Sequence, residues 1–239
     1  MGQVHEMIDL RDASAGPDHT RAFYALRELH RGQVVDLLIA EPPETLMRSL
    51  SQQLRYRIHW ETVAAGADYW RVRVRHRDDV EPAGVMDVLM RDHERLDRLF
   101  AQALQHVNAN AVDSARPLLE DYGLSLRRHI HVENDIRAPG LPVPRDGTGT
   151  DPVSVMLREH DSILEQLHII GSLLEDPAFD AGTLAAFMAL LSATLAKHEA
   201  REEQNLFPLW DTLYRHSGAP GLLARVKAVL AGAEDGVLG

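Results

Sequence analysis

The 239-residue sequence predicts a small α+β domain followed by an all-α region, and two observations lead to this division. Up to residue 76, short segments rich in β-branched residues alternate with short helical patterns, which is typical of a sheet with helices. From Val85 to about His216, apolar residues recur at the spacing of long amphipathic helices. Residues 77–84, between these regions, are polar and contain Pro and Gly, as expected of a linker.

The first domain, residues 1–76, is expected to form two layers with the element order β-α-β-α-β-β. Its first helix is expected to end at Gly32, because glycine commonly terminates helices. Alternating apolar and polar residues on both sides of AAGAD predict a closing hairpin. The strands are predicted at 3–10, 33–40, 56–63 and 69–76, and the helices at 18–32 and directly after Pro42 and Pro43.

The second domain, residues 85–239, is expected to be an up-down four-helix bundle with a short helix near its carboxyl end. Pro139 and Pro208 are expected to end or bend the preceding helices, because proline disfavours helical backbone at the residue before it. A long Pro- and Gly-rich loop is expected at 138–151. The long helices are predicted at 85–107, 113–137, 152–174 and 181–215, and the short one at 221–231.

An internal repeat divides the bundle into two helical hairpins of one design. Residues 85–99 (VMDVLMRDHERLDRL) align with 152–166 (PVSVMLREHDSILEQ), and 129–139 (HIHVENDIRAP) align with 198–208 (HEAREEQNLFP). Five pairs of polar residues match: Arg91 with Arg158, Asp92 with Glu159, His93 with His160, His129 with His198, and Glu133 with Glu202. The last three pairs lie on apolar stripes, so each helix is expected to turn polar side chains toward one interior.

The spacing His-x-x-x-Glu in the second and fourth helices points to a metal site. Residues four apart on a helix project on the same side, so His129 and Glu133, for example, can converge on one ion. Burying a carboxylate costs several kcal/mol unless a charge compensates it. The apolar stripes contain no Lys or Arg, so a bound cation is the simplest compensation.

A structural role is the alternative for each of these residues taken alone. A lone His on an apolar face is more often a hydrogen-bonded core residue than a ligand, and a lone His-x-x-x-Glu is common by chance. Two such pairs, each with a further His in a matching helix, are much harder to obtain by chance and favour metal binding. His131, His106 and His168 lie outside the repeated pattern, and we expect His131 at the surface.

Composition and charge exclude several other functions. A net charge of −11 argues against nucleic acid or a membrane surface as a partner, because both need clustered Lys and Arg. The chain has no cysteine, so thiolate metal sites and thiol catalysis are excluded, and carboxylates with imidazoles suit iron or manganese, with zinc as a further candidate. No run approaches the ~20 apolar residues that span a bilayer, and the amino terminus lacks a signal pattern, so we expect a cytoplasmic protein.

Residues 85 to about 216 resemble a hemerythrin-like, or HHE cation-binding, domain, whose repeated signature is carried here by His93, His129, Glu133, His160, His198 and Glu202. The resemblance implies two non-haem iron ions bridged by the two carboxylates. It assigns the first two histidines to one half of the site and the last two to the other. Invertebrate oxygen carriers have a further His where this chain has Leu164, which argues against oxygen carriage. The pattern is more similar to bacterial di-iron proteins that repair iron centres under nitrosative and oxidative stress.

Residues 1–76 resemble the small domain often fused to hemerythrin-like domains, which is similar in fold to TusA-like sulfur carriers. The resemblance rests on IDLRD (8–12), Trp60-Glu61 and WRVRV (70–74). The sulfur carriers use a Cys-Pro motif after the first strand, and this chain has no cysteine, so persulfide transfer is excluded.

Three functions are compatible with these residues. The first is a di-iron protein that binds or senses O2 or NO, with residues 1–76 passing the signal to a protein partner. The second is a di-iron enzyme that reduces NO or peroxide, or a protein that delivers iron to damaged centres. The third, metal storage or a structural metal, explains a second ion less well. The sequence shows no site for an electron-transfer cofactor, which favours binding over sustained turnover.

Overall fold

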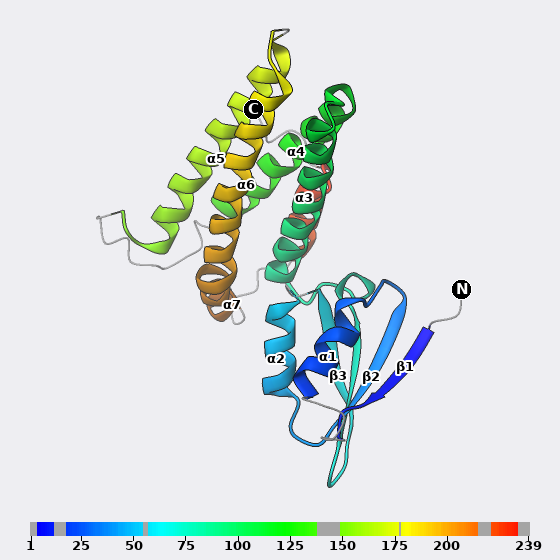
Figure 1. Cartoon of the computed structure of the whole chain (residues 1–239). Coiled ribbons are helices and arrows are strands. Elements are labelled where there is room, and N and C mark those ends of the chain that lie inside the picture. The colour runs from blue at the N-terminus through cyan, green and yellow to red at the C-terminus, as the bar shows by residue number, and fades with distance from the viewer. Residues whose placement is uncertain are drawn as a thin grey trace. The chain divides into compact units, whose positions relative to one another are not determined.

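The chain divides into two compact units, residues 1–81 and 82–239, in the computed structural model. The first unit contains a sheet with helices, and the second unit is helical (Figure 1). The residues that the structure describes are 4–11, 18–54, 57–137, 149–176, 178–214 and 221–233.

The strands and helices of the first unit follow each other in the predicted order (Figure 1). They are β1 (Val4–Asp9), α1 (Asp18–Arg27), β2 (Gln33–Ile39), α2 (Glu44–Gln53), β3 (Ile58–Ala65) and β4 (Trp70–His76). The sheet has the strand order β1-β2-β4-β3, with β1 parallel to β2 and the other neighbours antiparallel. Helix α1 ends at Arg27 and not at the predicted Gly32, whose φ of 79° belongs to the turn before β2.

Successive residues of β2 point to opposite faces of this sheet. Val35 and Leu37 belong to the hydrophobic cluster that also contains residues of α1 and α2. Asp36 faces the other way and is fully buried by its partners on β4. It accepts hydrogen bonds from Arg71 Nε at 2.6 Å and from Arg73 Nε at 3.0 Å, so the charge on this face is paired across two strands.

Residues 77–79 form a short 3-10 turn that belongs to the first unit. The N–H of Gly32 donates to the Asp79 carboxylate at 2.7 Å, and Arg77 is only 6% exposed. The first residues of the predicted linker are therefore structured, and the division between the units falls after Glu81.

The second unit is built on four long helices, which are followed by two short ones in the described part of the chain. They are α3 (Val85–Asn108), α4 (Val112–His131), α5 (Pro152–Glu175), α6 (Ala181–Arg201), α7 (Phe207–Tyr214) and α8 (Leu222–Leu230). Asp151 and Asp180 cap α5 and α6 by accepting the N–H groups of Ser154 and Thr183, each at 2.9 Å. None of the described helices is long and apolar enough to cross a membrane.

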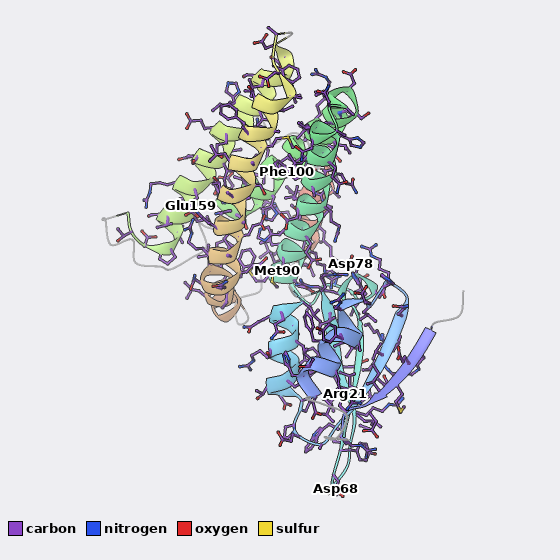
Figure 2. All side chains as sticks on the ribbon, in the orientation of Figure 1. Arg21, Asp68, Asp78, Met90, Phe100 and Glu159 are labelled. Carbon is purple, nitrogen blue, oxygen red and sulfur yellow. The ribbon has the colours of Figure 1, made fainter. Side chains whose placement is uncertain are left out.

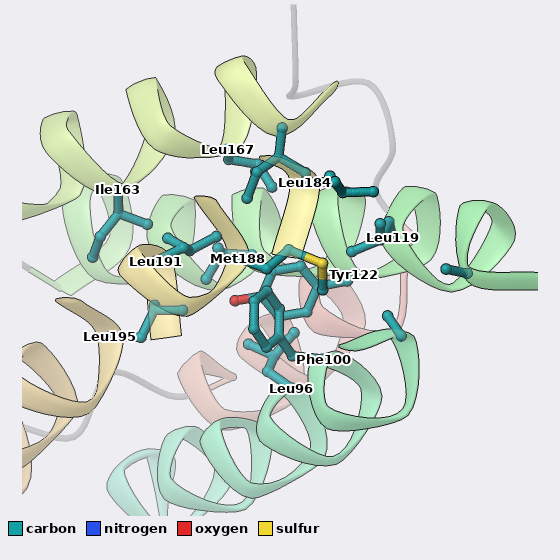
Figure 3. Close-up of a cluster of buried hydrophobic side chains, with 14 of the residues drawn as sticks. Leu96, Phe100, Leu119, Tyr122, Ile163, Leu167, Leu184, Met188, Leu191 and Leu195 are labelled. Carbon is teal, nitrogen blue, oxygen red and sulfur yellow. The ribbon is translucent and has the colours of Figure 1, made fainter. Parts of the chain in front are cut away.

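Helices α3 to α6 share one hydrophobic core, and Figure 3 shows side chains from all four meeting there. The residues labelled in Figure 3 are Leu96, Phe100, Leu119, Tyr122, Ile163, Leu167, Leu184, Met188, Leu191 and Leu195. A second cluster joins the first turns of α3 and α5 to α7 and α8, and it includes Leu89, Met156 and Trp210.

Helices α4 and α6 each continue into a π-helical turn, Val132–Arg137 and Glu202–Leu206. The predicted continuous α-helices over 113–137 and 181–215 are therefore wrong at these turns. Pro208 contributes to the second departure, because it has no N–H to donate to the carbonyl four residues earlier. Pro139 lies outside the described residues. Short π segments are frequent at functional sites, and these two contain Glu133 and Glu202.

Candidate metal centre

The six predicted ligands come together in one buried layer of the second unit. The layer consists of His93 from α3, His129 from α4, His160 from α5, His198 from α6, and Glu133 and Glu202 from the π turns. None of them is more than 4% exposed. The shared core lies on one side of the layer and the second apolar cluster on the other, so charges in the layer interact in surroundings of low polarity.

The ligand atoms form two groups, and within each group they all lie within 4.8 Å of one another. The first group is His93, His129, Glu133 and Glu202, and the second is His160, His198, Glu133 and Glu202. Each carboxylate lies between imidazoles of both halves. Glu133 lies 3.3 Å from the Nε2 atoms of His129 and His160, and Glu202 lies 3.4 Å from those of His93 and His198.

Several atoms of this layer lack the partner that a buried polar atom needs. Both carboxylate oxygens of Glu133, both of Glu202, and His129 Nε2 are buried without a hydrogen-bond partner. The Nε2 atoms of His160 and His198 lie 2.9 Å apart, a contact that needs a proton or a cation between or beside them. Native proteins satisfy nearly all buried polar groups. This donor set of imidazoles and carboxylates therefore fits a pair of transition-metal ions.

The opposite ring nitrogen of each imidazole is held by a side chain that the sequence analysis did not assign to the site. Each Nδ1 atom lies within hydrogen-bond distance of an oxygen: Asp92 for His129 (2.9 Å), Glu159 for His198 (3.0 Å), Glu203 for His93 (3.1 Å) and Asn134 for His160 (2.6 Å). Glu159 is labelled on α5 in Figure 2. Such contacts fix the ring and turn Nε2 toward the interior. The alignment of Asp92 with Glu159 in the sequence repeat could have indicated two of these four partners.

Burial and neighbouring carboxylates set the protonation of these groups. Burial alone would lower the pKa of His129, but Glu133 and Asp92 outweigh it and raise that pKa to about 9. The pKa of His93 is also raised well above its usual value, since two glutamates outweigh its burial. The pKa of Glu133 is lowered well below its usual value, because the imidazoles outweigh its burial. Protons thus balance the buried carboxylates in the metal-free chain, and a cation would replace them.

Glu199 is a further buried carboxyl group at this layer that we did not predict. It is 8% exposed, and burial raises its pKa to about 7. Together with His93 and His129 it lines a cavity of about 20 Å³, which has room for about one water-sized molecule. Glu199 follows the candidate ligand His198 directly, about 100° around the helix, so the spacing of the candidate ligands gave no reason to single it out.

A larger cavity of about 200 Å³ reaches the same layer from the side of α5. Its apolar wall includes Met156 and Leu206, and Glu202 is one of its lining residues. Glu159 and Arg201 also line it and form an ion pair. The cavity therefore connects a carboxylate of the layer with a space large enough for a small molecule.

The other histidines that the structure describes in this unit, His106, His131 and His168, lie outside the layer. His106 and His168 are exposed. His131 is more buried than we expected: its side chain is 13% exposed, and Nδ1 contacts the exposed Asp135 at 2.7 Å. The repeated pattern thus separated the clustered histidines from the others, although it misjudged the burial of one.

A family match covers the second hairpin of the candidate metal centre. Residues 151–232 match the hemerythrin HHE cation binding domain. The matched segment contains His160, His198 and Glu202, whereas the residues that the first hairpin contributes lie outside the matched range. The match supports cation binding by the second unit. No match was found among curated proteins or solved structures.

Proposed function

We propose that the second unit is a hemerythrin-like four-helix bundle that holds two non-haem iron ions. The proposed ligands are His93, His129, Glu133, His160, His198 and Glu202, with the two glutamates as bridges. The observation that carries the proposal is the set of buried glutamate oxygens without a hydrogen-bond partner between four imidazoles. Carboxylates with imidazoles and no thiolate favour iron, with manganese or zinc as substitutes.

We further propose that the centre binds or senses O2 or NO. The cavity beside His93 and His129 measures about 20 Å³, and its size suits a diatomic molecule better than a larger substrate. Apolar side chains such as Phe100 and Ile163 line it together with polar ones such as Asp97 and Glu199. Bound ferrous ions would supply the electrons and the open coordination positions that such a ligand needs.

The protein's own residues would then orient the imidazoles and keep bulk water out. Asp92 and Glu159 hold ring nitrogens, and the two apolar clusters close the layer. Tyr122 also lines the small cavity, and burial raises the pKa of its phenol well above the usual value, so the hydroxyl stays protonated. A neutral hydroxyl can donate a hydrogen bond within such a cavity.

Metal analysis of the purified chain tests the centre itself. We expect two transition-metal ions per chain in the wild type, and loss of at least one in Glu133→Ala and in Glu202→Ala. Glu165→Ala is the matched control, because Glu165 is an exposed glutamate of the same unit. A folded wild-type chain that binds no transition metal would refute the proposal.

Stopped-flow spectra of the reduced, iron-loaded protein test its reaction with gases. A stable oxygenated or nitrosyl spectrum supports binding or sensing. Rapid formation of nitrous oxide, or rapid loss of added peroxide, supports an enzyme that reduces NO or peroxide instead.

The cavity of about 200 Å³ favours this second candidate function, because it gives a small substrate access to Glu202. The same opening would let an ion leave, as iron delivery or the repair of iron centres requires. A Val155→Trp substitution, which fills the cavity, would slow turnover or iron release and leave metal content unchanged if either candidate holds.

We propose that residues 1–76 form a TusA-like domain that contacts a protein partner. Tyr24 on α1, which is 59% exposed, offers an apolar side chain for such a contact. A chain reduced to residues 82–239 should keep its metal and lose the partner in a binding assay.

A further inference from the structure

The two hairpins of the second unit place the same acceptors on one imidazole of each half. Asp92 lies 2.9 Å from Nδ1 of His129, and the aligned Glu159 lies 3.0 Å from Nδ1 of His198. Each of these carboxylates also pairs with an arginine, Arg95 in the first case and Arg201 in the second. In this respect the halves are equivalent.

The acceptors on the other two imidazoles differ. Glu203 lies 3.1 Å from Nδ1 of His93, whereas the aligned Asn134 lies 2.6 Å from Nδ1 of His160. One ring nitrogen thus faces a carboxylate and the other a neutral amide. A carboxylate acceptor makes an imidazole a stronger electron donor at its opposite nitrogen.

At two more pairs of aligned positions, one residue has a carboxyl group and the other is apolar. Glu199 aligns with Ile130, and Asp97 aligns with Leu164. Glu199 and Asp97 both line the small cavity beside His93. At these three aligned positions, the half of the layer with His93 and His129 therefore has carboxyl groups nearby. The other half has an amide and two apolar side chains at the matching positions.

We propose that these differences make the two ion positions inequivalent: the position at His93 and His129 takes the first ion and holds the more highly charged ion whenever the two differ. The inference rests on the proposed two-ion centre. Nearby carboxyl groups attract a cation, the buried Glu199 most strongly, and the stronger imidazole donor at His93 adds to this attraction. The position at His160 and His198 binds its ion more weakly and exchanges it first.

Calorimetric titration of the metal-free full chain with zinc ions tests this inference without any redox chemistry. We expect two binding steps whose affinities differ by about 10-fold or more, the typical effect of one such acceptor. Crystals loaded with one equivalent of zinc should show anomalous scattering beside His93 and His129. After partial oxidation of the iron form, Mössbauer spectra should show the ferric ion in one defined environment.

Two substitutions exchange the unequal acceptors. Glu203→Gln should weaken the first step by about 10-fold and leave the second nearly unchanged. Asn134→Asp should strengthen the second binding step and reduce the difference between the two affinities. This variant tests the inference independently if Glu203→Gln folds poorly. Glu165→Gln, an exposed change in α5, is the control and should alter neither step.

Equal affinities, or a first ion beside His160 and His198, would overturn the inference and leave the two-ion centre standing. A folded chain that binds no zinc would overturn both. A Glu203→Gln chain that weakens both steps equally would show that the glutamate acts on the fold and not on one position.

Discussion

At the scale of single residues, each imidazole of the layer is held at Nδ1 by an acceptor from another segment of the chain. Its Nε2 atom faces at least one of the two central glutamates. The acceptor on His93 lies 110 residues away in the sequence. The six candidate ligands could be singled out in the sequence because they repeat at helical spacing, but an acceptor this distant leaves no periodic signal. Glu199 was missed for a related reason, since a residue adjacent to a ligand falls off the stripe.

Asp92→Ala should lower the affinity for metal by about 10- to 100-fold, because His129 loses the acceptor that orients its ring. Competition with a chromophoric chelator measures the loss. Asp92→Asn should recover part of the affinity, since the amide oxygen of Asn134 is the acceptor at Nδ1 of His160. Asp161→Ala, an exposed aspartate on α5, should have no effect. Equal losses in the two alanine variants would contradict a positioning role for Asp92.

At the scale of helices, the starts of α5 and α6 follow rules that the sequence displays. Asp151 and Asp180 stand just before apolar stripes, and both cap their helices in the structure. The π turns were not predicted, because segments of six and five residues are too short to show a change of apolar period in the sequence. Only the backbone hydrogen bonds distinguish the two geometries.

Asp151→Ala should reduce the free energy of unfolding of the second unit by about 1 kcal/mol, because Ser154 loses its capping acceptor. Urea denaturation followed by circular dichroism measures the change, and Asp180→Ala should give a similar loss for α6. Glu175→Ala, at the carboxyl end of α5, should be neutral or slightly stabilising, because a negative charge there opposes the helix dipole. A destabilising effect of Glu175→Ala as large as that of Asp151→Ala would argue against the cap as the cause.

At the scale of the whole molecule, the two units have separate hydrophobic clusters, and a change in the first unit should leave the second unaffected. Alternation of apolar residues was enough to predict the order of strands and helices in the first unit. The pairing of Asp36 with two arginines could not be predicted, because β4 follows β2 only after a helix and a further strand.

Asp36→Asn should lower the free energy of unfolding of the first unit by about 1 to 2 kcal/mol at pH 6, an effect that solvent screening limits because Arg71 and Arg73 are partly exposed. Burial would raise the pKa of Asp36, but hydrogen bonds from Arg73, Arg71 and His5 outweigh it and lower the pKa to about 2, from an ordinary value of 3.8. The stabilisation is therefore present above pH 4 and is lost as the pH falls toward 2.

Urea denaturation of wild type and Asp36→Asn, both carrying Trp210→Phe, measures this difference through Trp60 and Trp70 alone. The two chains should differ at pH 6, and most of the difference should be lost by pH 2, where the carboxyl is about half protonated in the folded chain. Asp68→Asn, an exposed change in the turn between β3 and β4, should match the wild type throughout. A difference at pH 2 as large as the one at pH 6 would mean that the loss comes from packing and not from charge.

A row of stacked rings leads away from the candidate centre. Phe207 stacks on His93 with ring centroids 5.7 Å apart, and the fully buried Trp210 stacks on Phe207, also at 5.7 Å. An indole this close to a paramagnetic ion loses much of its emission, whereas zinc has no unpaired electron. In a Trp60→Phe, Trp70→Phe chain, iron should dim the fluorescence and zinc should not. The fluorescence of Trp210 would therefore report which metal the candidate centre binds.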